Sequence, residues 1–173
     1  MAITLMMVTS LVSNLAIAQS LDALVRLSPA GSFNAKTEAV EGFVFPVQGG
    51  YGAENIRVDL TGIKTGISLR DRHLQERMQT EKFPQARLIR AMGREGKGQA
   101  IIEIMGKQHR VQGDFRVEDN IFHAQFPLKL SDLDITDVRY MGVGVRDEIE
   151  VNLTLPIRDR QPASQPRSRS TSR

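Results

Sequence analysis

The residues most capable of chemistry lie together in one short stretch, Ser68 to His73, which holds a hydroxyl, two guanidinium groups, a carboxylate and an imidazole. Ser68, Asp71 and His73 supply the three group types of a nucleophilic triad. However, no Gly-x-Ser-x-Gly turn surrounds Ser68, and its hydroxyl is predicted to cap a helix instead. We therefore expect no nucleophilic catalysis from this stretch.

The same stretch has a second interpretation, as a polar gate for an anionic headgroup. Arg70 and His73 would contact the anion, and Asp71 would hold an arginine by a bidentate pair. For Asp71 the pattern favours a structural role, which is to complete a capping box with Ser68 and to offset the helix dipole. For Arg70 and His73 the binding role and the structural role both stay open.

Other candidates for chemistry are weak. His73, His109 and His123 have no ligand spacing such as His-x-x-x-His, and the chain has no cysteine, so neither a metal site nor a disulfide is expected. The acids fall mainly on outward strand positions or in loops, which argues against paired carboxylates in a cleft. The sequence predicts a protein that is not an enzyme and needs no cofactor.

A short helix, predicted over Ser68 to Met78, must position this stretch. Arg70 to Met78 contains no Gly, Pro or β-branched residue. Leu74 and Met78 are four residues apart and share one face, while the opposite face is polar. This pattern suits a lid laid across the end of a barrel.

Alternation of period two dominates the rest of the chain. Ile149, Val151, Leu153 and Leu155 alternate with polar residues, and similar segments recur between glycine-rich turns. No ten-residue helical pattern alternates with them, which favours antiparallel pairing. A sandwich is the alternative, but one closing helix favours a barrel, as does a set of inward aromatics: Phe33, Phe43, Phe45, Phe115, Phe122 and Phe126. The sequence predicts an all-β fold, an eight-stranded antiparallel β-barrel with a short helix closing one end.

The two ends differ from this middle. Residues 1–18 carry no charge and finish in Ala-Ile-Ala, which predicts a signal peptide cleaved after Ala18 and a periplasmic or secreted protein. The alternative is an uncleaved anchor or a buried helix. The barrel domain is predicted over residues 19–157.

Residues 158–173 form an Arg/Ser/Pro-rich tail that is predicted to be disordered, because it has no large apolar residue to bury. The tail carries five Arg and one Asp, a net charge of +4, so with +3 for the whole chain the other 157 residues carry −1. No nucleic-acid partner is therefore expected. The tail could contact an anionic membrane surface or another polyanion, or serve only as a solubilising extension.

Three motifs in order give the chain a family resemblance: Thr65-Gly66, then Arg70-Asp71-x-His73-Leu74, then Phe83-Pro84. They resemble the YceI-like family of exported, lipocalin-like proteins that bind polyisoprenoids or other lipids. Residues 98–107, 130–135 and 145–151 are similar to later strands and turns of that family. The resemblance covers roughly residues 22–157.

This resemblance implies a long apolar pocket for the isoprenoid or acyl chain of an amphiphilic lipid. The expected ligand-binding residues combine inward strand positions with the helix: Phe43, Phe45, Ile56, Val58, Leu60, Arg70, His73, Leu74, Met78, Leu88, Ile102, Ile104, Phe115, Phe122, Phe126, Val151 and Leu153. For each of these, ordinary core packing is the alternative.

Three hypotheses for function remain at this point. The first is a carrier or storage protein for a lipid, without catalysis. The second is an enzyme, or an accessory to one, acting on an isoprenoid or quinone. The third is an envelope-stress protein with a filled barrel and a polyanion-binding tail. The sequence leaves a homodimer open.

Overall fold

The structure is a computed structural model in which residues 19–140 and 142–160 are described. The predicted signal peptide and the tail beyond residue 160 lie outside these residues. Over the described ranges the chain forms twelve strands, one α-helix (α1) and one 3-10 helix (η1). Their bounds are β1 Ser20–Ser28, β2 Ser32–Thr37, β3 Val40–Glu41, β4 Val44–Val47, β5 Gly50–Asp59, α1 Ser68–Arg77, β6 Gln85–Arg94, β7 Lys97–Ile104, β8 Lys107–Glu118, β9 Ile121–Lys129, η1 Ser131–Leu133, β10 Arg139–Tyr140, β11 Val143–Val145 and β12 Glu148–Pro156.

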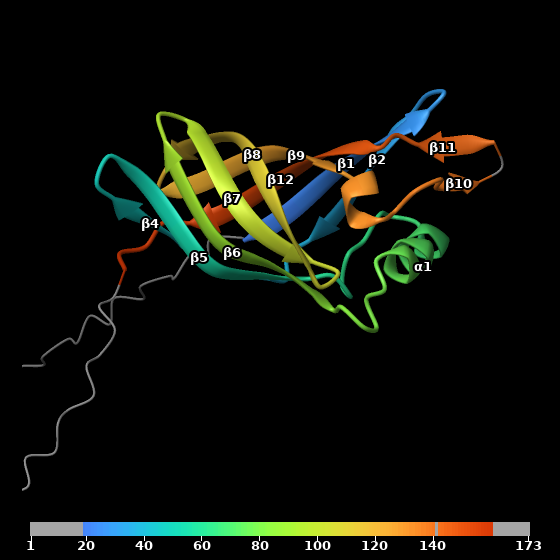
Figure 1. The fold of residues 1–173 in the computed structure, drawn as a ribbon, viewed down its shortest axis with the longest axis horizontal. Helices are drawn as coiled ribbons and strands as arrows, with labels where there is room; N and C mark the ends of the chain where they lie inside the picture. The colour runs from blue at the N-terminus through green and yellow to red at the C-terminus, as the bar shows by residue number, and fades with distance from the viewer. Residues whose placement is uncertain (1–18, 141, 161–173) are drawn as a thin grey trace, which may run out of the picture.

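The strands form one antiparallel sheet that curls into a nearly closed barrel (Figure 1). Strand order is β10-β11-β1-β12-β9-β8-β7-β6-β5-β3, with β2 on β1 and β4 on β5. Two isolated bridges connect β2 and β4, the strands off this path, to other segments of the chain. Lys36 and Lys64 exchange two backbone hydrogen bonds of 2.8 Å, and Val44 pairs with Ile157.

The all-β barrel class is confirmed, but the predicted count of eight strands is wrong. One difference arises at Gly42, which has a φ of +134° and separates β3 from β4. A Cβ there would come within 2.7 Å of the Ile56 side chain, so only glycine lets the backbone bend this close to β5. The chain therefore forms two short strands here, β3 and β4, rather than one longer strand.

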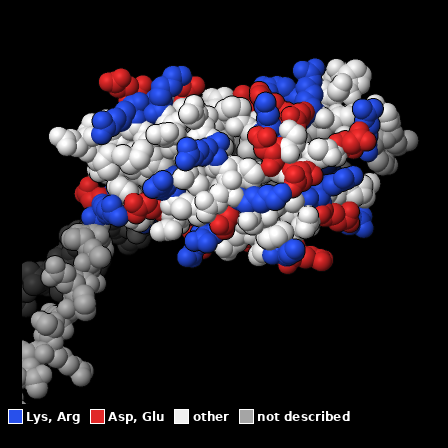
Figure 2. All heavy atoms as spheres, viewed as in Figure 1, with Lys and Arg blue, Asp and Glu red and all other residues white. Residues whose placement is uncertain are grey.

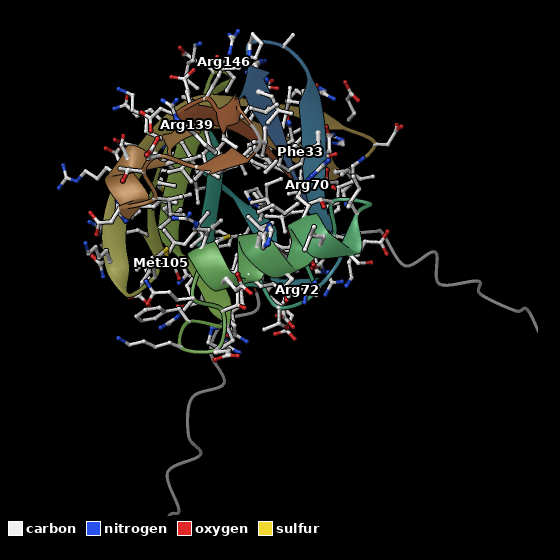
Figure 3. The ribbon with its side chains drawn as sticks, turned by 90° about the vertical axis from the view of Figure 1, so that its right-hand side faces the viewer. Phe33, Arg70, Arg72, Met105, Arg139 and Arg146 are labelled. Carbon is white, nitrogen blue, oxygen red and sulfur yellow. The ribbon has the colours of Figure 1, made fainter. Side chains whose placement is uncertain are left out.

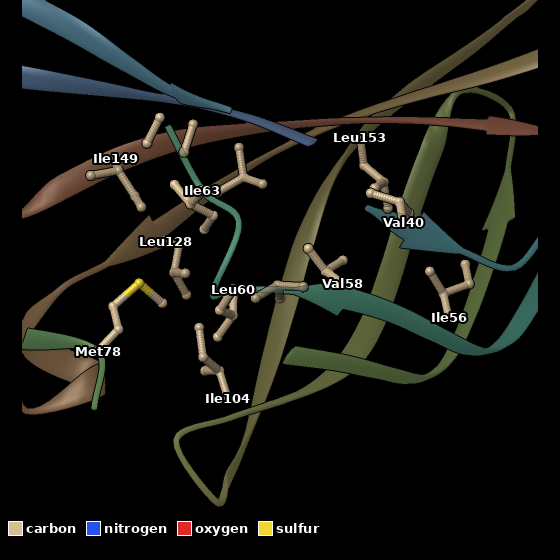
Figure 4. Packing of buried hydrophobic residues seen from close by; sticks show 14 of the residues in the cluster. Val40, Ile56, Val58, Leu60, Ile63, Met78, Ile104, Leu128, Ile149 and Leu153 are labelled. Atoms are coloured by element: carbon tan, nitrogen blue, oxygen red, sulfur yellow. The ribbon is translucent and has the colours of Figure 1, made fainter. Parts of the chain in front are cut away.

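Inward and outward positions alternate as predicted along the longer strands. In β12 the side chains of Ile149, Val151, Leu153 and Leu155 are buried, and the residues between them are half-buried. Each such side chain contributes about 1.5–3 kcal/mol when fully buried. Figure 4 shows Ile149 and Leu153 in the cluster of buried side chains that fills this part of the barrel, with Leu128 of the neighbouring strand β9 in the same cluster.

Helix α1 lies across one end of the barrel, as the lid interpretation predicted (Figures 1 and 3). Met78, the C-cap residue that follows the helix, is buried and Leu74 is half-buried, so this pair forms the inner face. A backbone bond of 2.8 Å from Leu60 to Pro84 ties the helix exit to the end of β5.

Candidate ligand-binding site

A cavity of about 820 Å³ opens inside the barrel beneath α1. Its walls are inward residues of most long strands, and its outer end is formed by α1, η1 and the β10–β11 segment. Most of the lining side chains are aliphatic, with Phe33 and Phe126 as the phenylalanine members. Such a cavity is suited to an apolar ligand, because it offers little to hydrogen-bond with water.

Most of the residues expected at the site lie on this cavity. The expected residues that line it are Ile56, Val58, Leu60, Arg70, His73, Leu74, Met78, Leu88, Ile102, Ile104, Phe126, Val151 and Leu153.

Four expected aromatics, Phe43, Phe45, Phe115 and Phe122, do not line the large cavity. Phe43 and Phe45 pack edge-to-face on each other, with ring centroids 6.5 Å apart. Phe45 is buried against Gly52, where a Cβ would come within 2.7 Å of its ring. The placement of these four on the cavity is thus corrected.

Three rings close the inner end of the site. Phe115 and Phe122 are stacked with centroids 4.8 Å apart, and Tyr51 meets them edge-on at 5.9 and 5.7 Å. They line a smaller cavity of about 70 Å³ that shares Ile56 and Leu88 with the large one. We call Tyr51, Phe115 and Phe122 the aromatic floor.

Two groups stand out among the lining residues that the sequence did not predict. The first lies on β1 and β2, where the period-two alternation was present but was not assigned to a pocket: Leu21, Ala23, Val25, Leu27, Phe33 and Ala35. The second lies near η1, β10 and β11, in segments too short to show a period: Leu130, Leu133, Ile135, Val138, Arg139, Val143 and Val145.

Among the described residues, six polar side chains line the cavity: Arg70, His73, Glu76, Arg77, Arg87 and Arg139. All but Arg87, which is on β6, come from α1 or from β10 at the mouth, so basic side chains outnumber the one acid there. The guanidinium carbon of Arg70 lies 4.2 Å from the centroid of the Phe33 ring. This cation–π contact holds Arg70 over the opening, since such pairs contribute about 0.5–1 kcal/mol at exposed sites.

Asp71 has a different role from either one predicted. The helix begins at Ser68 itself, with Ile67 at the N-cap position and no side-chain cap, so the capping box is wrong. One carboxylate oxygen of Asp71 instead accepts from Thr65, at 2.7 Å from the backbone N and 2.6 Å from Oγ1.

The ionic neighbour of Asp71 is Lys64 at 3.9 Å, and no bidentate arginine pair forms with the described residues. The hydrogen bonds from Thr65 are the main cause that holds the pKa of the Asp71 carboxyl below its usual value. Gly66, with a φ of +83°, makes the turn that brings Thr65 back to the helix. Asp71 therefore fastens the start of α1 to the loop before it.

The described residues contain no cluster of three or more His, Cys, Asp or Glu side chains arranged to hold a metal ion. Nor does any helix within residues 19–140 and 142–160 have the length and apolar content to cross a membrane.

Fold and site together define a class, an antiparallel lipocalin-like barrel with an apolar interior and a helix across its mouth. A family model for the YceI-like domain matches residues 19–157, and the chain belongs to this family. Such a barrel is consistent with binding hydrophobic ligands.

Two solved structures are similar to the chain. BcnA from Burkholderia cenocepacia aligns with a TM-score of 0.59 at 14% identity, over 79% of this chain and 94% of that one, and shows the same fold. A mutant CJ YCEI protein with a monobromobimane guest aligns at 14% identity over 70% and 82% of the two chains, with a TM-score of 0.49. No curated protein sequence matches the chain.

Proposed function

We propose that this protein encloses the isoprenoid or acyl chain of an amphiphilic lipid, as a non-catalytic carrier or storage protein. The observation that carries the proposal is the apolar cavity of about 820 Å³. Ligand sites typically measure about 300–1,000 Å³. A void of this size without a ligand forfeits packing energy, which a bound chain restores.

Burial of the chain would supply the affinity. At about 0.8 kcal/mol per buried CH₂, a chain of about fifteen carbons gains on the order of 10 kcal/mol before losses of freedom are subtracted. Affinity should therefore rise with chain length until the chain reaches the aromatic floor.

The mouth favours an anionic headgroup, because Arg70 and its cationic neighbours face the opening. Replacing Arg70 with Ala should weaken an anionic lipid more than the matching alcohol, while the melting temperature changes little. Arg90→Ala, an exposed outward position on β6, is the control. Equal weakening of both ligands would refute the headgroup role.

The rival functions have less support. An enzyme built on Arg70, Asp71 and His73 would need the Asp71 carboxylate, yet both strong hydrogen bonds to it come from Thr65. A filled-barrel protein is disfavoured by the cavity itself.

We also propose export to the periplasm or the exterior, with cleavage after Ala18. The family match begins at Gln19, the residue after the predicted cleavage site. Mass spectrometry of the mature protein should find Gln19 at the N-terminus, and an intact Met1 on exported protein would contradict the proposal. The tail remains a proposed contact for anionic lipids or other polyanions.

Native mass spectrometry with organic extraction tests the carrier function. The purified protein should release a lipid, and the variant Ala86→Phe should release much less, because Ala86 lines the cavity and a phenyl ring there would fill it. Gln85→Phe places the same ring at the preceding, exposed position of β6 and should leave uptake unchanged. Wild-type protein that carries no lipid and takes up none would refute the proposal.

A further inference from the structure

Three of the large apolar side chains that the described residues expose lie at the mouth. Ile67 is 50% exposed, Leu69 43% and Val143 39%, and all three also line the cavity. The other two, Met92 and Val117, do not line it. We call Ile67, Leu69 and Val143 the apolar rim.

The apolar rim is built by two separate parts of the fold. Ile67 and Leu69 flank the first residue of α1, and Val143 begins β11. The helix and the β10–β11 segment lie at the same end of the barrel (Figures 1 and 3). The rim therefore continues the cavity wall out into solvent, which is unfavourable for a surface that faces only water.

Positive charge surrounds the rim. Figure 3 shows Arg70, Arg72, Arg139 and Arg146 around the open end. Arg139 is paired with Asp137 at 2.8 Å, whereas the side chains of Arg72 and Arg146 form no ion pair with the described residues. By contrast, basic and acidic side chains are interspersed over the face in Figure 2, which gives no comparable excess of one sign.

Apolar side chains at the tip would contact the acyl chains of an anionic lipid membrane, and the cations around them would contact the phosphate headgroups above those chains. A water-insoluble chain also needs an apolar path at the moment it leaves the cavity, a step that rests on the proposed function. We propose that the mouth docks on an anionic bilayer, with the apolar rim in the acyl boundary, so that the chain passes directly between cavity and membrane.

Vesicle binding by the ligand-free mature protein, residues 19–173, tests the docking itself. The protein should bind vesicles of phosphatidylglycerol and phosphatidylcholine, bind pure phosphatidylcholine more weakly, and be released by salt. Val143→Ser should weaken binding on the order of fivefold, and serine at all three rim positions on the order of a hundredfold.

Val117→Ser is the matched control, since Val117 is 36% exposed and lies on β8 next to Phe115 at the opposite end. Equal loss in Val143→Ser and Val117→Ser would overturn the proposal. The proposal would also be overturned if the wild-type protein did not bind vesicles, or if its apolar rim formed a dimer interface or bound another protein instead.

Transfer kinetics test the direct path, with a long-chain fluorescent fatty acid moving from the protein to acceptor vesicles. A collision with the membrane makes the rate rise with vesicle concentration and with phosphatidylglycerol content, whereas diffusion through water makes it independent of both. A rate independent of vesicle concentration would overturn the proposal but leave the carrier function standing. Protein that binds vesicles through the rim yet never takes up the fatty acid would instead refute the carrier function.

Discussion

The aromatic floor should set the length of chain that the cavity accepts, and Phe115→Ala tests this. The ring of Phe115 is tightly packed, because a Cβ on Gly93 would come within 2.6 Å of it. Removing the ring joins its space to the small cavity of about 70 Å³ and so to the large one. Two additional buried methylenes would gain about 1.6 kcal/mol, roughly a tenfold increase in affinity for the longer chain.

Competition binding with a homologous series of fatty acids measures the effect. In wild-type protein the affinity should rise with each carbon and then level off, and in Phe115→Ala the levelling should move to chains at least two carbons longer. The variant should lose about 2 kcal/mol of stability, since Phe115 is half-buried.

Phe43→Ala is the control for this series. Phe43 is also half-buried but lines neither the large cavity nor the small one, so it should lose similar stability without a change in preferred length. An unchanged optimum in Phe115→Ala, or the same shift in both variants, would refute the floor.

Three more predictions concern stability and the tail. Asp71→Asn should lower the melting temperature near neutral pH. Because the pKa of Asp71 is depressed in the folded protein, the difference in melting temperature between wild type and variant should shrink as the pH falls below about 4. Asp119→Asn, in an exposed turn, should change the melting temperature little. Gly113→Ala should lower the free energy of unfolding, measured by chemical denaturation, by about 2 kcal/mol, because the added Cβ would lie 2.1 Å from a backbone oxygen. Its cross-strand partner Gly98 should tolerate Ala, since the nearest atom to a Cβ there is 3.6 Å away. Deleting residues 161–173, which hold three of the five Arg of the tail, should strongly weaken salt-sensitive heparin binding and leave the melting temperature unchanged. Undiminished binding would rule out these residues as the contact.

Sequence alternation predicted which face of a strand is inward, and that prediction is sound where strands are long. It could not predict depth along the barrel axis. Ile104 and Phe115 both have inward positions, yet one lines the cavity and the other lies in its floor. The alternation of inward and outward residues carries no information on the depth of a residue along the barrel axis, because that depth depends on strand tilt and register.

The start of α1 shows a second limit of sequence reasoning. Ser68 and Asp71 have the spacing of a capping box, but the carboxylate is taken by Thr65, six residues before it. Asp71 bonds to Thr65 rather than forming a capping box with Ser68 because the turn at Gly66, which has a positive φ, directs Thr65 toward the helix. Local spacing alone does not encode such a turn.

The end of the described chain has a practical consequence. Arg160 lies 4.9 Å over the ring of Phe45 and pairs with Glu54 at 2.9 Å, and Arg158 donates its backbone N–H to Val44, so the chain leaves the barrel beside β4 and β5. This end is opposite α1 (Figure 1). Protein immobilised on a sensor surface through a chain that ends at Arg160 would therefore present the mouth to the solution.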